Sequence, residues 1–427
     1  MTAVVGVLNK QAVAIAADSA VTIGNGTGTG TKIFNRANKI FTLSKYHPVG
    51  IMIYNEGSFM ETPWETIIKV YRKEINRKSF DTVNEYKNDF LLFLTRNNFF
   101  ILNNSDINFL KFSLEETLEE LIKDLLNRND FSKIDPKSLP EIIFKDLRTK
   151  ISEYVLFFEK NRNELPEFLE SKFEEYAPKL RDSLNSQISE KLSQISSSYD
   201  DSINEEILKL FFLFVTDVQS LEDRFTGLVF TGFGEKEYFP QLISLRVSFP
   251  FQNKLRFYVK EDENASIGSI HGATISPFAQ KDVIETILMG IDPGFQNSIF
   301  KNFEDTSQQL VNLLANSIEK TDPITAKSLR TIDLDPVVKN FVKSIEEYQN
   351  SKHISPLMDA VSTLSKEDLA EMAESLIYLT YLKRRITFAQ ESVGGPVDVA
   401  IISKGDGFIW IKRKHYMIIR NHTSKDK

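Results

Sequence analysis

The chain of 427 residues contains no cysteine. Without thiols it can form no disulfide, it has no cysteine nucleophile, and it cannot bind a metal through thiolates. Its five histidines are scattered along the sequence without the spacing of a metal-ligand pair. We therefore expect neither a bound metal nor a cofactor.

Long apolar runs and a strong excess of one charge are also missing. No segment reaches the run of about 18 apolar residues that a membrane helix needs. The N-terminus lacks the basic flank and long apolar region of a secretory signal. The 52 basic and 59 acidic residues are mixed throughout, and a net charge of −7 argues against a phosphate-binding surface. We expect a cytoplasmic protein that contacts neither a membrane nor nucleic acid.

The opening stretch is the most informative part of the chain. Two apolar runs, Ala3 to Leu8 and Ala12 to Ala17, lie on either side of a short polar break. This pattern predicts a β-hairpin whose first strand begins directly after Thr2. Chain termini usually fray unless something holds them. A strand that starts at the third residue therefore suggests that the terminus has a role.

The rest of the chain divides by its periodicity. Residues 80 to 220 show apolar side chains at helical spacing in segment after segment, and strand patterns return from Thr226. We interpret 1–79 and 221–427 as one domain, interrupted by a helical insertion at 80–220. The insertion is either a bundle that covers the domain or an oligomer contact, or else a dedicated partner-binding arm.

Three residues near the start carry a resemblance to a known family. Thr2 comes first, Asp18 lies in the small-small-Asp-Ser element Ala16 to Ser19, and Lys39 precedes another apolar run. In these features the chain resembles proteasome β-type peptidases and their bacterial relatives, which belong to the N-terminal nucleophile hydrolase superfamily. Lys32 also precedes an apolar pair and is the competing candidate for the lysine. The continuous strand predicted after Lys39 favours Lys39.

A second match lies near the C-terminus. A long helix predicted from Lys366 to Ala389 leads to the pair Gly394-Gly395 and a strand, as in proteasome-type chains. Val393 stands where the family has a serine, and Gln390 where it has an acidic residue. The auxiliary site that orients the threonine amine in the family is therefore altered here.

The resemblance implies a fold and a reaction. The fold would be α+β, a four-layer αββα sandwich of the N-terminal nucleophile hydrolase type with a large helical insertion. The reaction would be threonine-type hydrolysis of a peptide or amide. The Thr2 hydroxyl would be the nucleophile, and its α-amine, exposed by removal of Met1, the base. Lys39 would disfavour protonation of that amine and Asp18 would hold Lys39. A backbone N–H near Tyr54 would complete the oxyanion hole.

Other positions have weaker matches. Ser276 stands where the family has a serine near the threonine, although Pro277 after it equally suggests a helix cap. Thr22 stands where a family threonine contacts substrate through its backbone. Met52 and Ala37 fall where the family builds its specificity pocket and suggest an apolar substrate side chain, with Glu56 nearby.

The resemblance also implies partners. It suggests a homo-oligomer and, because the chain has no ATPase signature, any unfoldase partner would be a separate chain. The substrate would be a peptide or a small amide. The alternative is a non-catalytic scaffold used in assembly. Val393 and the turn Tyr54-Asn55, which replaces the family's paired glycines, favour the scaffold. The retained Thr2, Asp18 and Lys39 favour the enzyme.

Overall fold

The computed structural model of the chain describes residues 2–24, 31–34, 37–97, 105–128, 138–194, 202–222, 224–268, 271–387 and 394–414. Its strands are β1 (Ala3–Asn9), β2 (Val13–Ala17), β3 (Val21–Gly24), β4 (Thr31–Phe34), β5 (Ile40–Thr42), β6 (Val49–Asn55), β7 (Ser58–Phe59), β8 (Thr62–Pro63), β9 (Thr226–Gly232), β10 (Gln241–Phe251), β11 (Lys254–Val259), β12 (Ala265–Ser266), β13 (Ala273–Ala279), β14 (Asp398–Ser403) and β15 (Gly407–Lys412). Its α-helices are α1 (Trp64–Ile75), α2 (Val83–Arg96), α3 (Ser105–Arg128), α4 (Leu139–Asn161), α5 (Phe173–Ser193), α6 (Ser202–Val215), α7 (Asp282–Met289), α8 (Pro293–Ile318), α9 (Pro323–Arg330), α10 (Asp335–Gln349), α11 (Ser355–Thr363) and α12 (Lys366–Ile386).

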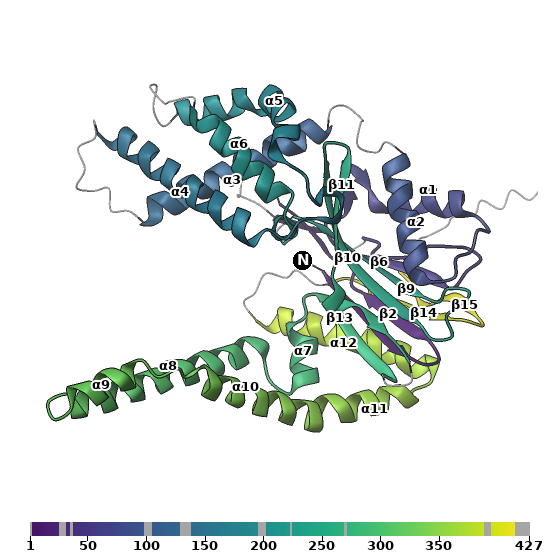
Figure 1. Ribbon diagram of the computed structural model, residues 1–427. Coiled ribbons are helices and arrows are strands. Elements are labelled where there is room, and N and C mark those ends of the chain that lie inside the picture. The colour runs from purple at the N-terminus through teal and green to yellow at the C-terminus, as the bar shows by residue number, and fades with distance from the viewer. Residues whose placement is uncertain are drawn as a thin grey trace, which may run out of the picture.

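Two antiparallel sheets form the centre of the molecule (Figure 1). The first has the strand order β13-β1-β2-β14-β15, and the second has the order β11-β10-β9-β6-β5. The predicted opening hairpin is confirmed, since β1 pairs antiparallel with β2, for example Val4 opposite Ala17. The expected α+β class is also what the chain adopts.

The sheets face each other, and helices cover their outer faces. Val4 and Leu8 of β1 point between the sheets, where they pack with Met52 of β6. Alternate residues of β1, such as Val5, point outward to α12. Because both faces of β1 are buried, its sequence is continuously apolar rather than alternating. On the far side, α1 and α2 pack against the second sheet, with Trp64 fully buried.

The insertion has a hydrophobic core of its own, made by α3, α4, α5 and α6. Helix α2 does not belong to it. Its buried residues, including Phe90, pack with α1 and with the strands of the second sheet. The predicted boundary at residue 80 is therefore one helix too early, because the helical pattern alone does not tell which core a helix joins.

A buried arginine joins the insertion to the second sheet. The Arg256 guanidinium on β11 donates to the Val215 carbonyl at the end of α6 (2.7 Å) and to the Ser220 hydroxyl (2.6 Å). It lies over the Phe249 ring, 4.3 Å from the centroid. Complete burial lowers the pKa of Arg256 to about 9. The side chain therefore keeps its charge at pH 7.

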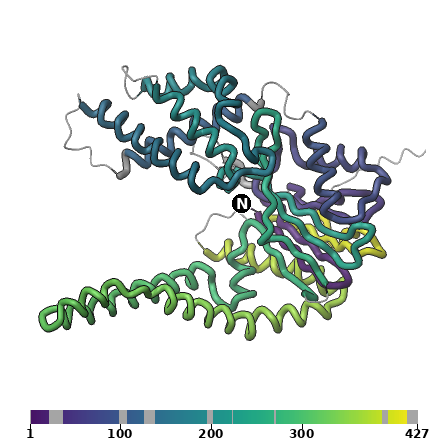
Figure 2. The backbone as a smooth tube through the Cα atoms, viewed as in Figure 1, coloured from purple at the N-terminus to yellow at the C-terminus, as the bar shows by residue number. Residues whose placement is uncertain are grey.

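Helices α8, α9 and α10 form a second projection. They extend away from the sandwich, and α11 leads the chain back to it (Figure 1). The tube in Figure 2 shows that the outgoing and returning segments run side by side. Aromatic stacking holds them, with Phe303 on Phe341 at 4.0 Å between centroids. The extension of these helices from the body was not predicted from the sequence. We call residues 293–349 the arm.

Gly227 provides a test of this packing. It lies on β9 beneath the Tyr54 ring, where an added Cβ would come within 2.1 Å of ring atoms. We expect Gly227→Ala to lower the free energy of unfolding by about 1–3 kcal/mol, the usual cost of overpacking. Urea unfolding measures it. Gly57→Ala is the matched control, because no atom lies within 4 Å of its added Cβ. Equal stability of the two variants would contradict the packing described.

Candidate active site

The Asp18 carboxylate is the centre of the predicted site. It lies just after β2 and is buried. Its Oδ1 accepts hydrogen bonds from the Ala3 N–H (2.9 Å) and from Lys39 Nζ (2.6 Å). Its Oδ2 accepts from the N–H groups of Ala20 and Gly394, both at 3.1 Å. Four donors suit an ionised carboxylate, which only accepts hydrogen bonds. Asp18 thus joins β1, the start of β5 and the segment before β14.

Lys39 is equally buried, with 4% of its surface exposed. Besides Asp18, its ammonium donates to the Ala20 carbonyl at 2.6 Å. Burial lowers the pKa of Lys39, and Asp18 only partly opposes that effect; the positive charge of Lys414 lowers it further. The third N–H of the ammonium has no partner among the described residues. Lys39 can therefore donate one more hydrogen bond, or give up a proton more readily than an exposed lysine.

Thr2 lies directly beside this pair. The peptide group between Thr2 and Ala3 is held at both polar atoms, because Ala3 donates to Asp18 and the Gln280 N–H donates to the Thr2 carbonyl at 3.2 Å. The same oxygen of Asp18 holds Lys39. The Thr2 hydroxyl makes no hydrogen bond to any part of the chain that the structure describes. Thr2, Asp18 and Lys39, which are predicted to act together, are thus brought together.

The turn after β6 was predicted to supply the oxyanion donor at Tyr54. The Tyr54 ring packs against Phe225 and Phe278, and burial raises its pKa to about 12. The phenol therefore stays neutral and belongs to the core. The donor expected for the oxyanion is therefore a backbone N–H of this turn and not the phenol.

Strand geometry favours the next residue as that donor. Ile53 donates its N–H to the Lys39 carbonyl at 2.8 Å. N–H groups alternate in direction along a strand, so the N–H of Asn55 points to the same side, toward Lys39. Asn55 has a φ of 69°, in the left-handed region that favours glycine and that asparagine adopts more readily than most residues. Asn55 thus takes the backbone conformation of a glycine that the family has here.

The other predicted residues have different positions. Ser276 lies within β13 opposite Gly6, four residues along β1 from Thr2. It caps no helix, since α7 begins at Asp282. Thr22 lies on β3 and Lys32 on β4, and the side chains of both are outside the described part of the chain. Val393 and Gln390 are also outside it.

Met52, one of the two residues expected near the specificity pocket, is fully buried between the sheets. A cavity of about 440 Å³ instead opens beside the turn that carries Asn55. Its wall includes Glu56, Phe59, Phe225 and residues of α3. The apolar surface near the turn thus comes partly from the insertion, which sequence comparison with the family could not indicate.

Sequence reasoning missed a second buried ion pair. Lys414 Nζ contacts Asp398 Oδ2 (2.5 Å), the Ser19 hydroxyl (2.7 Å) and the Ala37 carbonyl (2.7 Å). Both charged side chains are buried. The pair fixes Ser19 and so supports its neighbour Asp18. An aspartate at the start of a buried apolar strand was a signal for Asp398; nothing in the sequence distinguished Lys414 from its basic neighbours.

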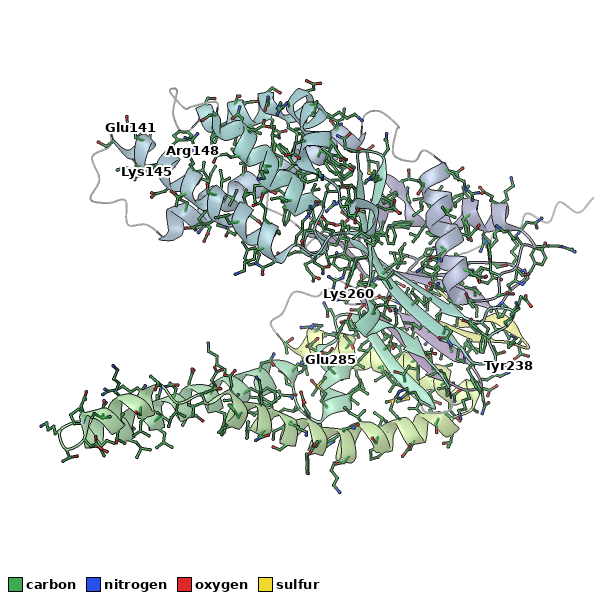
Figure 3. All side chains as sticks on the ribbon, in the orientation of Figure 1. Glu141, Lys145, Arg148, Tyr238, Lys260 and Glu285 are labelled. Carbon is green, nitrogen blue, oxygen red and sulfur yellow. The ribbon has the colours of Figure 1, made fainter. Side chains whose placement is uncertain are left out.

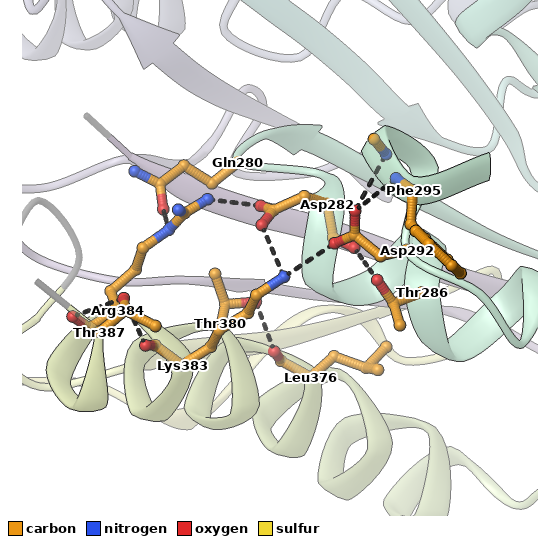
Figure 4. A network of polar contacts seen from close by, with 11 residues as sticks. Gln280, Asp282, Thr286, Asp292, Phe295, Leu376, Thr380, Lys383, Arg384 and Thr387 are labelled. Carbon is orange, nitrogen blue, oxygen red and sulfur yellow. Dashed lines mark hydrogen bonds and ion pairs between the residues drawn. The ribbon is translucent and has the colours of Figure 1, made fainter. Parts of the chain in front are cut away.

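A third polar network runs from Gln280 through Arg384 and Lys383 to Asp292 (Figure 4). Gln280, which holds the Thr2 carbonyl, accepts a hydrogen bond from Arg384 Nε at 2.6 Å. Arg384 also pairs with Asp282 at 2.5 Å. Lys383 then links Asp282 to Asp292, with distances of 3.1 and 3.3 Å. Asp292 caps α8, the first helix of the arm.

The described residues contain neither a cluster of metal-binding side chains nor a helix that could span a membrane. No group of three or more histidine, aspartate or glutamate side chains is placed there to hold a metal ion. No helix among them has both the length and the apolar composition needed to cross a bilayer. Comparison with models of protein families gives no match, and comparison with curated proteins gives no significant match.

The charge of Lys39 makes the Asp18 pair testable. We expect Asp18→Asn to lower the free energy of unfolding at pH 7 by about 3–5 kcal/mol, because a buried ammonium loses its counter-charge. Without Asp18 the pKa of Lys39 falls further. The folded variant then binds fewer protons than the unfolded chain, so its stability rises with pH and the deficit shrinks between pH 7 and 10.

Urea unfolding of both proteins across this pH range measures the effect. Asp81→Asn is the control, since its pair with Lys236 is exposed and such pairs contribute less than about 1 kcal/mol. A deficit that does not change with pH would mean that Lys39 is not the group concerned.

Proposed function

We propose that the protein is a threonine-type amide hydrolase of the N-terminal nucleophile class, acting on a peptide or a small amide. The observation that carries the proposal is the buried ion pair of Lys39 and Asp18. The same carboxylate oxygen of Asp18 accepts hydrogen bonds from Lys39 and from the N–H of Ala3, the residue after Thr2. Two facing sheets with helices on both outer faces support the proposal, because an αββα arrangement is what this class would require.

In the proposed reaction, removal of Met1 leaves Thr2 with an α-amine whose reference pKa is about 8. The amine takes the proton of the Thr2 hydroxyl as the oxygen attacks the substrate carbonyl. It then gives that proton to the leaving amine, and the acyl group remains as an ester on Thr2. Water, activated by the same amine, hydrolyses the ester and regenerates the hydroxyl.

The neighbouring groups have distinct roles. The Lys39 charge disfavours protonation of the α-amine before attack and stabilises the developing alkoxide. Asp18 already accepts four hydrogen bonds, so it positions Lys39 and takes no proton. The N–H of Asn55 donates to the oxyanion, since that of Tyr54 points to the other side of β6. Removing such a donor typically costs about 3 kcal/mol of transition-state stabilisation.

The substrate side chain is proposed to be apolar. Five phenylalanines, Met60 and Val247 make up half of the residues that line the cavity beside the Asn55 turn, and Glu56, Glu61 and Arg224 are among the others. A partner ATPase, if the substrate is a folded protein, would be a separate chain.

A non-catalytic scaffold is the second candidate. The observation in its favour is that only 5% of the Thr2 surface is exposed, which leaves little access to its hydroxyl. The two candidates differ in whether Thr2 reacts.

Intact mass spectrometry with a threonine-directed electrophile distinguishes them. For the hydrolase we expect loss of Met1 and addition of one equivalent at Thr2. Thr2→Ser should keep the adduct and Thr2→Ala should lose it, because only a side chain with a hydroxyl can attack. Thr95→Ala is the control, since the Thr95 hydroxyl only bonds within α2. Retained Met1, or an adduct that survives in Thr2→Ala, would overturn the hydrolase and favour the scaffold.

A further inference from the structure

The arm, residues 293–349, has almost no interior. Its three helices contribute no residue to the four hydrophobic clusters of the molecule. Within them only Gln296, Ala315, Ala326 and Gln349 are buried. Figure 3 shows side chains standing out along both edges of the arm. Two helices side by side cannot cover each other's outer surfaces, so the arm leaves most of its surface to solvent or to a partner.

Apolar side chains gather in the half of the arm that lies farther from the sandwich. We call them the distal patch, and all are large and exposed: Leu310, Leu313, Leu314, Ile324, Ile332 and Val337. The spacing of the three leucines places them on one face of α8. The inner contact of the arm does not use them, since it is made by Phe300, Phe303 and Phe341. An outward apolar face on a helix that the chain itself does not cover indicates an interaction surface.

The mixture of charges on the arm indicates which kind of partner it can bind. Residues 293–349 contain six basic and eight acidic side chains, interspersed along all three helices. A membrane surface or a nucleic acid would require an excess of basic residues. With nearly balanced charges around an apolar patch, two copies of the arm can approach each other without strong repulsion.

The size of the arm is sufficient for such an association. Helix α8 has 26 residues and is therefore about 39 Å long at 1.5 Å per residue. Two helices side by side are about 20 Å wide, so one face of the arm offers roughly 800 Å². A standard stable interface buries about that area on each partner.

We propose that two copies of this chain associate through their arms, distal patch against distal patch, as an antiparallel four-helix arrangement. The contact is then symmetric, with the same surface used by both copies. This inference depends on the arm alone and not on the chemistry proposed for Thr2.

Sedimentation velocity across nanomolar to micromolar concentrations tests it with the full chain. We expect a dimer whose dissociation constant rises at least tenfold in the double variant Leu310→Ser, Leu313→Ser. Leu156→Ser on α4 is the matched control, because Leu156 is 65% exposed and Leu313 is 67% exposed. The control should dimerise like the wild type. A wild-type monomer at micromolar concentration, or an oligomer that the double variant leaves unchanged, would overturn the proposal.

Single-cysteine variants give an independent measurement, since the natural chain has no cysteine. Under mild oxidation we expect disulfide-linked dimers from at least one of Leu313→Cys, Ile324→Cys and Ile332→Cys, and none from Leu156→Cys. These exposed sites should leave the fold intact, which circular dichroism verifies. Cross-linking no stronger at the arm positions than at Leu156 would overturn the arm-to-arm contact even if the protein is a dimer.

Discussion

The buried negative charge of Asp18 is the constraint on which the rest of the site depends. A carboxylate out of water is tolerated only when hydrogen bonds replace its hydration. Here the four donors come from four separate segments: β1, the residues after Asp18, Lys39 and Gly394. The hydrogen bonds that the Asp18 carboxylate requires thus fix where β1, the start of β5 and the segment before β14 meet. The predicted catalytic residues are held by the same bonds that stabilise the fold.

The other buried polar groups extend this arrangement outward. Lys414 donates a hydrogen bond to Ser19, the neighbour of Asp18. The opposite charges of Lys414 and Asp398, both buried, compensate each other. On the opposite side, Gln280 holds the Thr2 carbonyl and is itself held by Arg384. The backbone at Thr2 is therefore held by two hydrogen bonds, one from Gln280 to the Thr2 carbonyl and one from the Ala3 N–H to Asp18. The Thr2 hydroxyl makes no hydrogen bond to any described residue. The hydroxyl can therefore donate a hydrogen bond to a general base, and this contact is what activates a threonine hydroxyl.

Local patterns predicted the parts of the structure that local interactions determine. The opening hairpin follows from two apolar runs and a polar break, and the long helix predicted from Lys366 is α12, which begins at that residue. The choice of Lys39 over Lys32 was based on the continuous strand predicted after Lys39. The partner of Lys414, the membership of α2 in the sandwich core and the extension of the arm were not predictable. Each depends on contacts between segments tens to hundreds of residues apart, for which a single sequence carries no periodic signal. The shift from Tyr54 to Asn55 as the better-placed donor required the hydrogen-bond direction along β6.

The two ends of the described chain meet at Asp18, and this has a consequence for protein synthesis. Ala3 and Lys39 are made early, but Gly394 and the Asp398–Lys414 pair are made several hundred residues later. At roughly 5–20 residues per second, the interval between Asp18 and Gly394 is about 20–80 s. Throughout that time the nascent chain carries the threonine and the aspartate without their complete surroundings. The hydrogen-bond partners of Asp18 are thus complete only after Gly394 has been synthesised.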